Sequence, residues 1–237
     1  MHPQLITDNL QSVLKRIARS CHELGNGGES VTLLCISKTV PTATIQMAID
    51  AGQRHFGENY VDEAVSKIAA LAQRPVRIQW HFVGSTQSNK TEAIARNFDW
   101  VHSVERVKIA RLLAQHRPRD LSNLQVCIPI QVNIGGEASK GGVDVESLPE
   151  LVEELLAQPR LTLRGLMSIP PPSQDPATQR GFHRRLHEIF LDLQRKVRTL
   201  DTLSMGMSQD LETAISEGST MVRVGTDIFG ARSGGVR

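Results

Sequence analysis

The sequence lacks the features of a secreted or membrane-inserted protein. No apolar stretch approaches the ~18 residues that a membrane-spanning helix needs, and the first residues, MHPQLITDNLQ, contain no basic segment followed by an apolar one. The cysteines, Cys21, Cys35 and Cys127, include no CxxC pair and lie in apolar segments, where a free thiol behaves as a small hydrophobe. We therefore expect a cytoplasmic protein with reduced, buried cysteines.

An excess of charge of one sign is also absent. The 237 residues include 27 Lys and Arg and 25 Asp and Glu, spread fairly evenly, for a formal net charge of +2. No strong field therefore exists to attract nucleic acid or anionic lipid, and we exclude both as principal partners. No repeat or low-complexity linker divides the chain, so residues 1–237 are expected to form a single domain, which we expect to be a monomer.

What the sequence does contain is an alternation of helical and strand-like patterns. Apolar residues recur at helical spacing from Leu10 to Leu24, ahead of GNGG, and again from Phe182 to Val197. Eight apolar strand-like runs follow the first helix, at residues 33–38, 54–59, 77–84, 99–104, 124–133, 161–170, 201–206 and 220–226. Such alternation predicts a parallel sheet, and eight units most naturally close into a barrel. We predict an α/β fold, a single-domain (β/α)8 TIM-type barrel with an additional N-terminal helix; an open doubly wound sheet is the alternative.

Polar side chains follow the ends of these predicted strands. In a parallel barrel the loops after the strands form one face, where binding and active sites gather. That face would carry Lys38, Glu58, Asn59, Asn133, Met167, Ser168, Ser204, Gly225 and Thr226. Partial burial at such a mouth favours the neutral amine of a lysine, which forms a Schiff base with a carbonyl. For Lys38 the carbonyl could belong to a sugar-like substrate or to pyridoxal phosphate (PLP).

A phosphate site is suggested by the last two strand ends. LSMGMSQDLETAI places Ser204 and Ser208 before a helix, and VRVGTDIFG offers Gly225 for close backbone approach and Thr226 as a hydroxyl donor. The alternative is ordinary helix capping by Ser208 and a turn at Gly225. Asp210, in the first turn of the predicted helix, would partly oppose an anion.

Seven motifs, taken in order, cover nearly the whole chain and resemble those of the pyridoxal phosphate homeostasis proteins, the YggS/PROSC family. They are SKT at 37–39, AGQRHFGENYVDEA at 51–64, WHFVGSTQSNK at 80–90, QVNIGGEASKGG at 131–142, GLMSIP at 165–170, LSMGMSQDLETAI at 203–215 and GSTMVRVGTDIFGAR at 218–232. One departure is GSTQSNK, where Ser85 and Thr86 replace the proline and bulky apolar residue more usual in the family. This departure concerns the shape of that loop.

The resemblance implies a barrel like the N-terminal domain of alanine racemase, with PLP as its cofactor. It implies that Lys38 holds PLP as an aldimine and that Arg223 faces the pyridine nitrogen. The other expected cofactor-binding residues are Ser204, Ser208, Gly225 and Thr226 in the phosphate segments, and Asn59 and Met167 at the pocket.

The function implied by the resemblance is intracellular PLP homeostasis, in which the protein stores, buffers or delivers PLP, with PLP-dependent apo-enzymes as possible partners. An arginine at the pyridine nitrogen weakens the ring as an electron sink, which argues against catalysis. The sequence also ends soon after its eighth strand and has one tyrosine, Tyr60, so we expect no second racemisation base. A PLP-dependent racemase, or another Schiff-base enzyme such as an aldolase, is the alternative.

We expect no metal site. His183 and His187 stand one helical turn apart, as zinc ligands can, but no third ligand lies near them in the pattern. The neighbouring arginines favour a solvated helix face. The glycine-rich segment 133–142, which contains Lys140, does not match a phosphate-binding Walker motif and is predicted to be a connecting loop.

Overall fold

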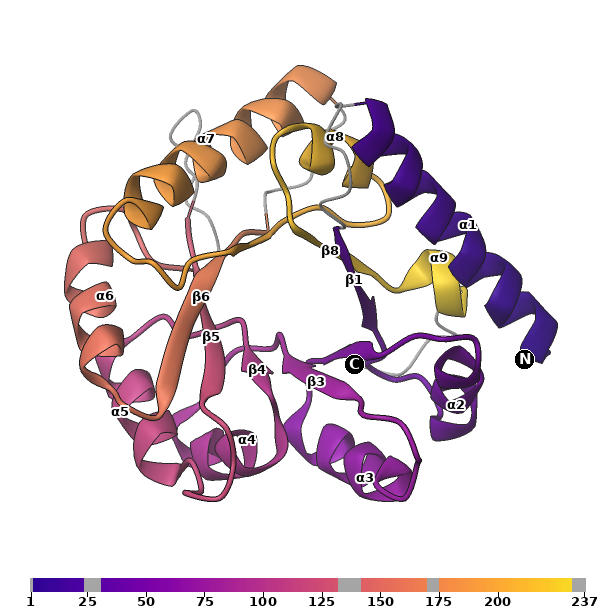
Figure 1. The fold of residues 1–237 in the computed structure, drawn as a ribbon, viewed down its shortest axis with the longest axis horizontal. Coiled ribbons are helices and arrows are strands. Elements are labelled where there is room, and N and C mark those ends of the chain that lie inside the picture. The colour runs from indigo at the N-terminus through magenta and orange to yellow at the C-terminus, as the bar shows by residue number, and fades with distance from the viewer. Residues whose placement is uncertain (1, 24–30, 132–141, 170–174, 232–237) are drawn as a thin grey trace.

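Eight parallel strands close into a barrel in sequence order, and β8 completes it by pairing with β1 (Figure 1). This computed structural model describes residues 2–23, 31–131, 142–169 and 175–231. The strands are β1 (Thr32–Ile36), β2 (His55–Glu58), β3 (Gln79–Phe82), β4 (Trp100–Val101), β5 (Leu124–Pro129), β6 (Leu161–Met167), β7 (Thr202–Ser204) and β8 (Met221–Val224). The predicted TIM-type barrel is confirmed, and the open-sheet alternative is wrong.

Helices surround the strands as an outer ring, as Figure 1 shows. They are α1 (Pro3–Glu23), α2 (Thr42–Asp50), α3 (Val61–Leu71), α4 (Thr91–Asn97), α5 (Val107–His116), α6 (Leu148–Ala157), α7 (Pro176–Gln194), α8 (Leu211–Ser216) and α9 (Thr226–Phe229), with a short 3-10 helix η1 (Ser88–Lys90) before α4. The predicted N-terminal helix is α1, which precedes the barrel and packs against α2, α8 and α9.

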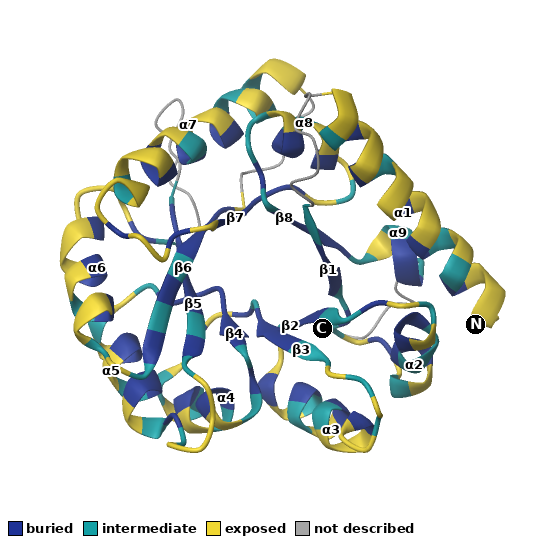
Figure 2. Cartoon of the chain, in the orientation of Figure 1, coloured by how far each residue is buried: buried dark blue, intermediate teal, exposed yellow. Residues whose placement is uncertain are grey.

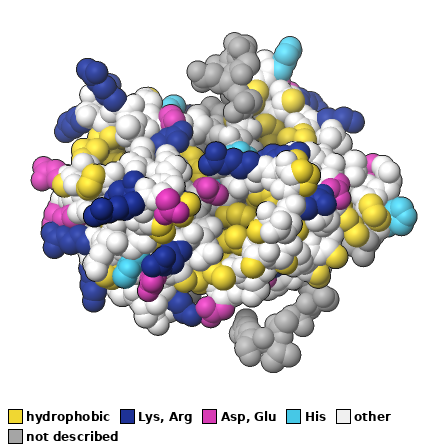
Figure 3. All heavy atoms as spheres, turned by 60° about the horizontal axis from the view of Figure 1, so that its bottom comes forward, with side chains coloured by type: hydrophobic (Ala, Val, Ile, Leu, Met, Phe, Trp, Pro, Cys, Tyr) yellow, Lys and Arg dark blue, Asp and Glu magenta, His cyan; other side chains and the backbone are white. Residues whose placement is uncertain are grey.

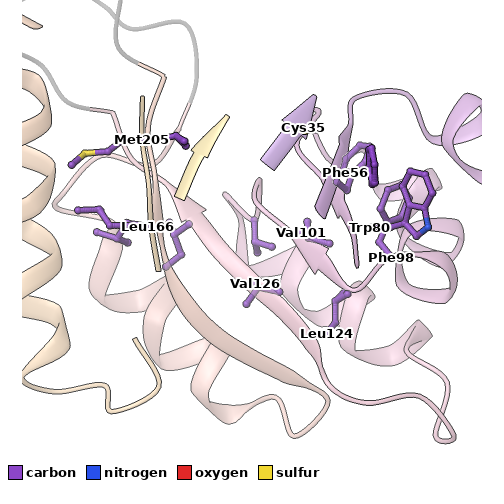
Figure 4. Close-up of a cluster of buried hydrophobic side chains, with 14 of the residues drawn as sticks. Cys35, Phe56, Trp80, Phe98, Val101, Leu124, Val126, Leu166 and Met205 are labelled. Carbon is purple, nitrogen blue, oxygen red and sulfur yellow. The ribbon is translucent and has the colours of Figure 1, made fainter. Parts of the chain in front are cut away.

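The main hydrophobic core lies between the strands and this ring of helices. Each helix turns its buried face inward and its exposed face outward (Figure 2). Phe56, Trp80 and Phe98 gather on one side of the barrel, where large aromatic side chains fill the layer between sheet and helices (Figure 4). A second, smaller cluster consists of Trp100, Cys127 and Met167. The strands are therefore buried on both faces, which explains their nearly continuous apolar runs.

The close packing of β6 against β7 requires glycine at position 165. Gly165 of β6 lies beside Thr202 of β7, and a Cβ atom built on Gly165 would come within 1.6 Å of the Thr202 carbonyl oxygen. No side chain can be accommodated against backbone at that distance. The barrel wall between β6 and β7 thus requires glycine at this position.

The predicted strands extend beyond the observed ones at several ends. β1 ends at Ile36 and not at Lys38, although the amide of Ser37 still donates to the carbonyl oxygen of Gly57 at 2.9 Å. Thr39 then takes a left-handed φ of 62°, which turns the chain away from the sheet. Two residues named above, Asn133 and Lys140, lie outside the described residues.

The surface agrees with the absence of a dominant charge. On the face drawn in Figure 3, basic and acidic side chains are interspersed. Among the helices that the structure describes, none combines the length and apolar composition needed to cross a membrane. All three cysteines are free thiols, with Cys35 and Cys127 buried and Cys21 partly buried.

Candidate functional site

The predicted site residues gather at the carboxyl-terminal end of the barrel. Because the strands are parallel, residues that end or follow them share one rim. The pairing of β1 with β8 sets Leu34 opposite Arg223, so the segments that carry Lys38 and Gly225 leave the barrel as neighbours. Along the chain the predicted residues are Lys38 two positions after β1, Asn59 after β2, Met167 ending β6, Ser204 ending β7, Ser208 in the next loop, Arg223 in β8, and Gly225 and Thr226 after β8.

Arg223 is a buried cation held by two neighbouring strand ends. Its Nη1 donates to the carbonyl oxygen and the hydroxyl of Ser204 at 2.7 and 2.8 Å, and its Nη2 donates to the carbonyl oxygen of Ser168 at 2.6 Å. Burial lowers the pKa of Arg223 to about 10, so the side chain stays protonated at neutral pH. Its Nε donates to no atom in the described part of the chain, which leaves one donor of a fixed cation uncommitted.

Ser204 contacts the guanidinium group. Its side chain is fully buried, and its hydroxyl accepts the hydrogen bond from Arg223. The residue therefore orients Arg223, a role that its position after a strand did not reveal. A contact between Ser204 and a phosphate stays a prediction.

The segment after β8 presents polar donors at the rim. Gly225 separates β8 from α9, and Thr226 at the start of α9 is exposed. Within the described residues, no backbone carbonyl accepts a hydrogen bond from the amides of Gly225 and Thr226. Two amides and a hydroxyl are donors of the kind that bind phosphate oxygens. Ser208 is half-buried in the preceding loop, where its carbonyl oxygen accepts from Nη2 of Arg16 at 2.8 Å.

The remaining predicted residues flank the β8 segment at a distance of two strands, with Asn59 after β2 and Met167 at the end of β6. Met167 is buried against Trp100 and Cys127, and burial raises the pKa of the Cys127 thiol to about 12, so that thiol remains neutral. Asn59 is half-buried, and its carbonyl oxygen would lie 2.2 Å from a Cβ atom on Gly84. The chain therefore passes very close to Asn59 after β3.

Asp210 is occupied by protein partners. Its Oδ2 lies 3.0 Å from Nε2 of His183, and its Oδ1 accepts from the amide of Met207 at 2.7 Å. Burial opposes ionisation, but the His183 contact, the Met207 amide and the Arg223 charge together lower the pKa of Asp210. The carboxylate is thus committed to the loop fold. The sequence suggested that Asp210 would repel a bound anion, and these hydrogen bonds to protein groups weaken that repulsion.

The expected solvated helix face is wrong for His183. This side chain is fully buried and makes its contact with Asp210 across the α7–α8 interface. No cluster of three or more potential metal ligands exists in the part of the chain that the structure describes.

The unusual GSTQSNK loop is accommodated by a local polar contact. Thr86 is 1% exposed, and its hydroxyl lies 2.8 Å from the hydroxyl of Ser103 after β4. Ser85 is exposed. The hydroxyl pair satisfies the buried polar group that replaces an apolar side chain at Thr86.

Sequence reasoning missed a column of histidines in the barrel. Nδ1 of His55 lies 3.0 Å from Nε2 of His81, and Nδ1 of His81 lies 2.9 Å from Nε2 of His102. The ring of His81 stacks on Trp100 with centroids 5.2 Å apart. Burial and the Arg223 charge lower the pKa of His102 to about 3, so this histidine is neutral. The sequence did indicate these residues, because each of the three histidines interrupts one of the predicted apolar strands.

A hollow of about 350 Å³ lies among the segments that follow β4 and β5. It is bordered by Glu105, Lys108, Val143 and Glu150, between the loop before α5 and the start of α6. None of the predicted site residues lines it.

Comparison with known proteins identifies the family. A family model for the alanine racemase N-terminal domain matches residues 13–233. The chain is 50% identical over 230 residues to the pyridoxal phosphate homeostasis protein of Pseudomonas aeruginosa, a match that covers 97% of each chain. The chain belongs to the pyridoxal phosphate homeostasis protein family. The family member from Escherichia coli K12 is 46% identical over 228 residues, covering 96% of this chain and 97% of that one.

A solved structure from the family supports the same assignment. PipY of Synechococcus elongatus PCC7942, determined with PLP bound, superimposes with a TM-score of 0.81. The two proteins are 34% identical, and the match covers 95% of this chain and 100% of PipY. The resemblance derived from the sequence motifs is therefore confirmed at the level of family and fold.

Proposed function

We propose that this chain is a cytoplasmic, monomeric, single-domain protein that holds PLP on Lys38 and buffers it or delivers it to PLP-dependent apo-enzymes. The observation that carries the proposal is the pairing of β1 with β8, which brings the segment of Lys38 beside a buried, fixed Arg223. The names of the relatives and the PLP-bound structure of PipY support the same ligand.

The donor set at the rim fits this ligand. PLP, when bound, supplies an aldehyde and an electron-withdrawing pyridine ring. Lys38 contributes the amine, whose Nζ forms a C=N bond with the aldehyde carbon while the aldehyde oxygen leaves as water, without any change of oxidation state. Arg223 donates to the pyridine nitrogen, and the segment of Gly225 and Thr226, with Ser208, donates to the phosphate.

We propose storage and transfer in place of catalysis because of the state of Arg223. A guanidinium that remains protonated donates to an unprotonated pyridine nitrogen, and this weakens the ring as an electron sink. Tyr60, the sole tyrosine of the sequence, is 55% exposed at the start of α3. It is therefore poorly placed to act as a buried second base for racemisation.

The absorption spectrum of the purified protein, before and after borohydride reduction, tests this proposal. We expect a visible band that borohydride removes, and peptide mapping should place the reduced label on Lys38. Lys38→Ala should lose the band, with adducts at Lys140 as the internal check for nonspecific labelling. A wild-type protein that carries no label on Lys38 contradicts the proposal.

Delivery requires a second measurement. Loaded protein is mixed with an apo-form of a PLP-dependent enzyme in the presence of excess PLP phosphatase, which destroys free cofactor. Activation of the apo-enzyme under these conditions supports direct handover. Activation that disappears with the phosphatase supports buffering alone, and size-exclusion chromatography of the loaded protein checks that it is a monomer.

A further inference from the structure

A buried ionic cluster contacts both neighbours of Lys38 and was given no role in the function proposed above. Nζ of Lys67, on α3, lies 2.9 Å from Oε1 of Glu58, the last residue of β2, and it also pairs with Glu63 one helical turn earlier. Lys67 is only 5% exposed and Glu58 is fully buried. Burying ionised groups costs free energy, so a contribution to stability does not by itself explain why this cluster is present.

The cluster contacts the chain on both sides of Lys38. Before it, Ser37 uses its carbonyl oxygen to accept from Nζ of Lys67 at 2.7 Å and its hydroxyl to donate to Oε1 of Glu58 at 2.6 Å. After it, the amide of Thr39 donates to Oε1 of Glu63 at 2.6 Å. The backbone that carries Lys38 is thus held at each neighbouring residue by groups from β2 and α3.

The local backbone needs such support. Thr39 has a φ of 62°, a left-handed conformation that a β-branched residue adopts at a free-energy cost. The amide of Val40 closes the turn by donating to the carbonyl oxygen of Ser37 at 3.0 Å, and Lys67 shares that acceptor. A strained turn held by charged hydrogen bonds fixes the direction in which the chain leaves β1.

Among the described residues, the cluster leaves one of its own oxygens unmatched. Oε2 of Glu58 is buried and has no hydrogen-bond partner in the described part of the chain. Burial raises the pKa of Glu58, against the hydrogen bonds of Ser37 and Lys67, which lower it. An apolar pair at these positions would avoid this unmatched oxygen, but it could not bind the carbonyl oxygen of Ser37 or the amide of Thr39.

We propose that Lys67 is a positioning residue for Lys38, which, together with Glu58 and Glu63, fixes the backbone that presents the reactive amine. This inference rests on the proposed attachment of PLP to Lys38. It assigns Lys67 to the covalent step and not to noncovalent retention of the ligand, because the proposed phosphate donors lie on the segments after β7 and β8. Misplacement of a reacting group by about 1 Å can slow a reaction by about 10²-fold.

The test separates covalent attachment from noncovalent binding. Apo-forms of the wild type and Lys67→Met are mixed with PLP, and the rate of appearance of the borohydride-sensitive band is followed by stopped flow. Pyridoxine 5′-phosphate, which has an alcohol in place of the aldehyde, is titrated calorimetrically. We expect Lys67→Met to slow attachment of PLP by about 10²-fold and to bind pyridoxine 5′-phosphate as tightly as the wild type does. Lys67→Arg should recover part of the rate.

The matched control is Lys90→Met. Lys90 pairs with Asp62 of α3 at 2.8 Å, but this pair is exposed and contacts neither neighbour of Lys38, so attachment should proceed at the wild-type rate. An unchanged rate in Lys67→Met, or equal losses for both ligands, overturns the inference. If Lys67→Met does not fold, Glu63→Ala decides in its place, since Glu63 is partly exposed and holds the amide of Thr39. Absence of label on wild-type Lys38 instead defeats the proposed function itself.

Discussion

The histidine column predicts that the protein loses stability at mildly acidic pH. His81 and His102 are fully buried, and each is hydrogen-bonded to another neutral ring. The pKa of His81 lies well below its ordinary value, mainly because the ring is buried, and the charges of the neighbouring His102 and His55 lower it further. Burial and Arg223 lower the pKa of His102 from 6.5 to about 3. The native state therefore keeps both rings neutral at pH values where the unfolded chain protonates them.

The sign and size of the effect follow from this difference. Between pH 6.5 and about 3, unfolding takes up protons, so the free energy of unfolding falls as the pH falls. One pH unit below the unfolded value costs about 1.4 kcal/mol for each histidine. At about pH 5.5 the two rings together should cost about 3 kcal/mol, a large share of the 5–15 kcal/mol typical of a folded domain.

Urea unfolding at several pH values between about 7.5 and 5.5 measures this loss. In His102→Gln the contribution of one ring is absent, so the loss of unfolding free energy between about pH 7.5 and 5.5 should be smaller than in the wild type by about 1.4 kcal/mol. Glu58 acts in the opposite direction because its native pKa is raised, but it is common to both proteins and cancels in the comparison. Equal slopes, or ring NMR signals of His81 and His102 that titrate near the ordinary histidine pKa, would refute the reasoning.

Three further predictions concern the site, the barrel wall and catalysis. Thr226→Val should weaken PLP binding by about 1.5–3 kcal/mol more than pyridoxal binding in parallel calorimetric titrations. Ser204→Ala should instead weaken both ligands, because it removes an acceptor from Arg223. Gly165→Ala should destabilise the fold by about 4 kcal/mol or more, measured by urea unfolding, because its Cβ would collide with the Thr202 carbonyl oxygen. Loaded protein incubated with L-alanine in deuterated water should show at most slow Cα exchange without sustained D-alanine, since a missing second base costs about 10²–10⁴-fold.

The sequence was sufficient to predict the order and number of the strands, but not their ends. Eight apolar runs separated by helical patterns were enough for a closed barrel, because parallel strands are buried on both faces. Because several residues beyond the strand ends are also buried and apolar, the sequence pattern does not show where the hydrogen bonds between strands stop. The run at residues 99–104 contains a strand of only two residues, Trp100–Val101, and the run ending at Lys38 contains a strand that ends at Ile36.

The candidate site was predictable where it follows from strand ends and unpredictable where it depends on contacts through space. The ends of β1 and β8 indicated Lys38 and Gly225, and the family motif indicated Arg223. No pattern along the chain shows that Ser204 binds a guanidinium group or that three histidines meet inside the barrel. The buried position of Lys67 could have been predicted from the sequence, because Lys67 lies three residues after Ala64 on the buried face of α3. A lysine in such a stripe indicates a buried partner.

Polar groups near the ends of β1, β2, β7 and β8 support our proposal that the protein holds a cofactor. Outside β1 and β2, the cluster of Lys67, Glu58 and Glu63 fixes the turn that carries Lys38. Before α8, the charge of the Asp210 carboxylate acts on the Arg223 cation, but the hydrogen bonds of that carboxylate go to His183 and to the amide of Met207. In the described part of the chain Arg223 hydrogen-bonds to Ser204 and Ser168 and to no carboxylate, so its charge suits an anionic ligand and opposes protonation of a ring nitrogen beside it. A racemase shares this barrel, but fold alone does not confer its chemistry. We propose storage over catalysis on the strength of this fixed cation and not of the architecture.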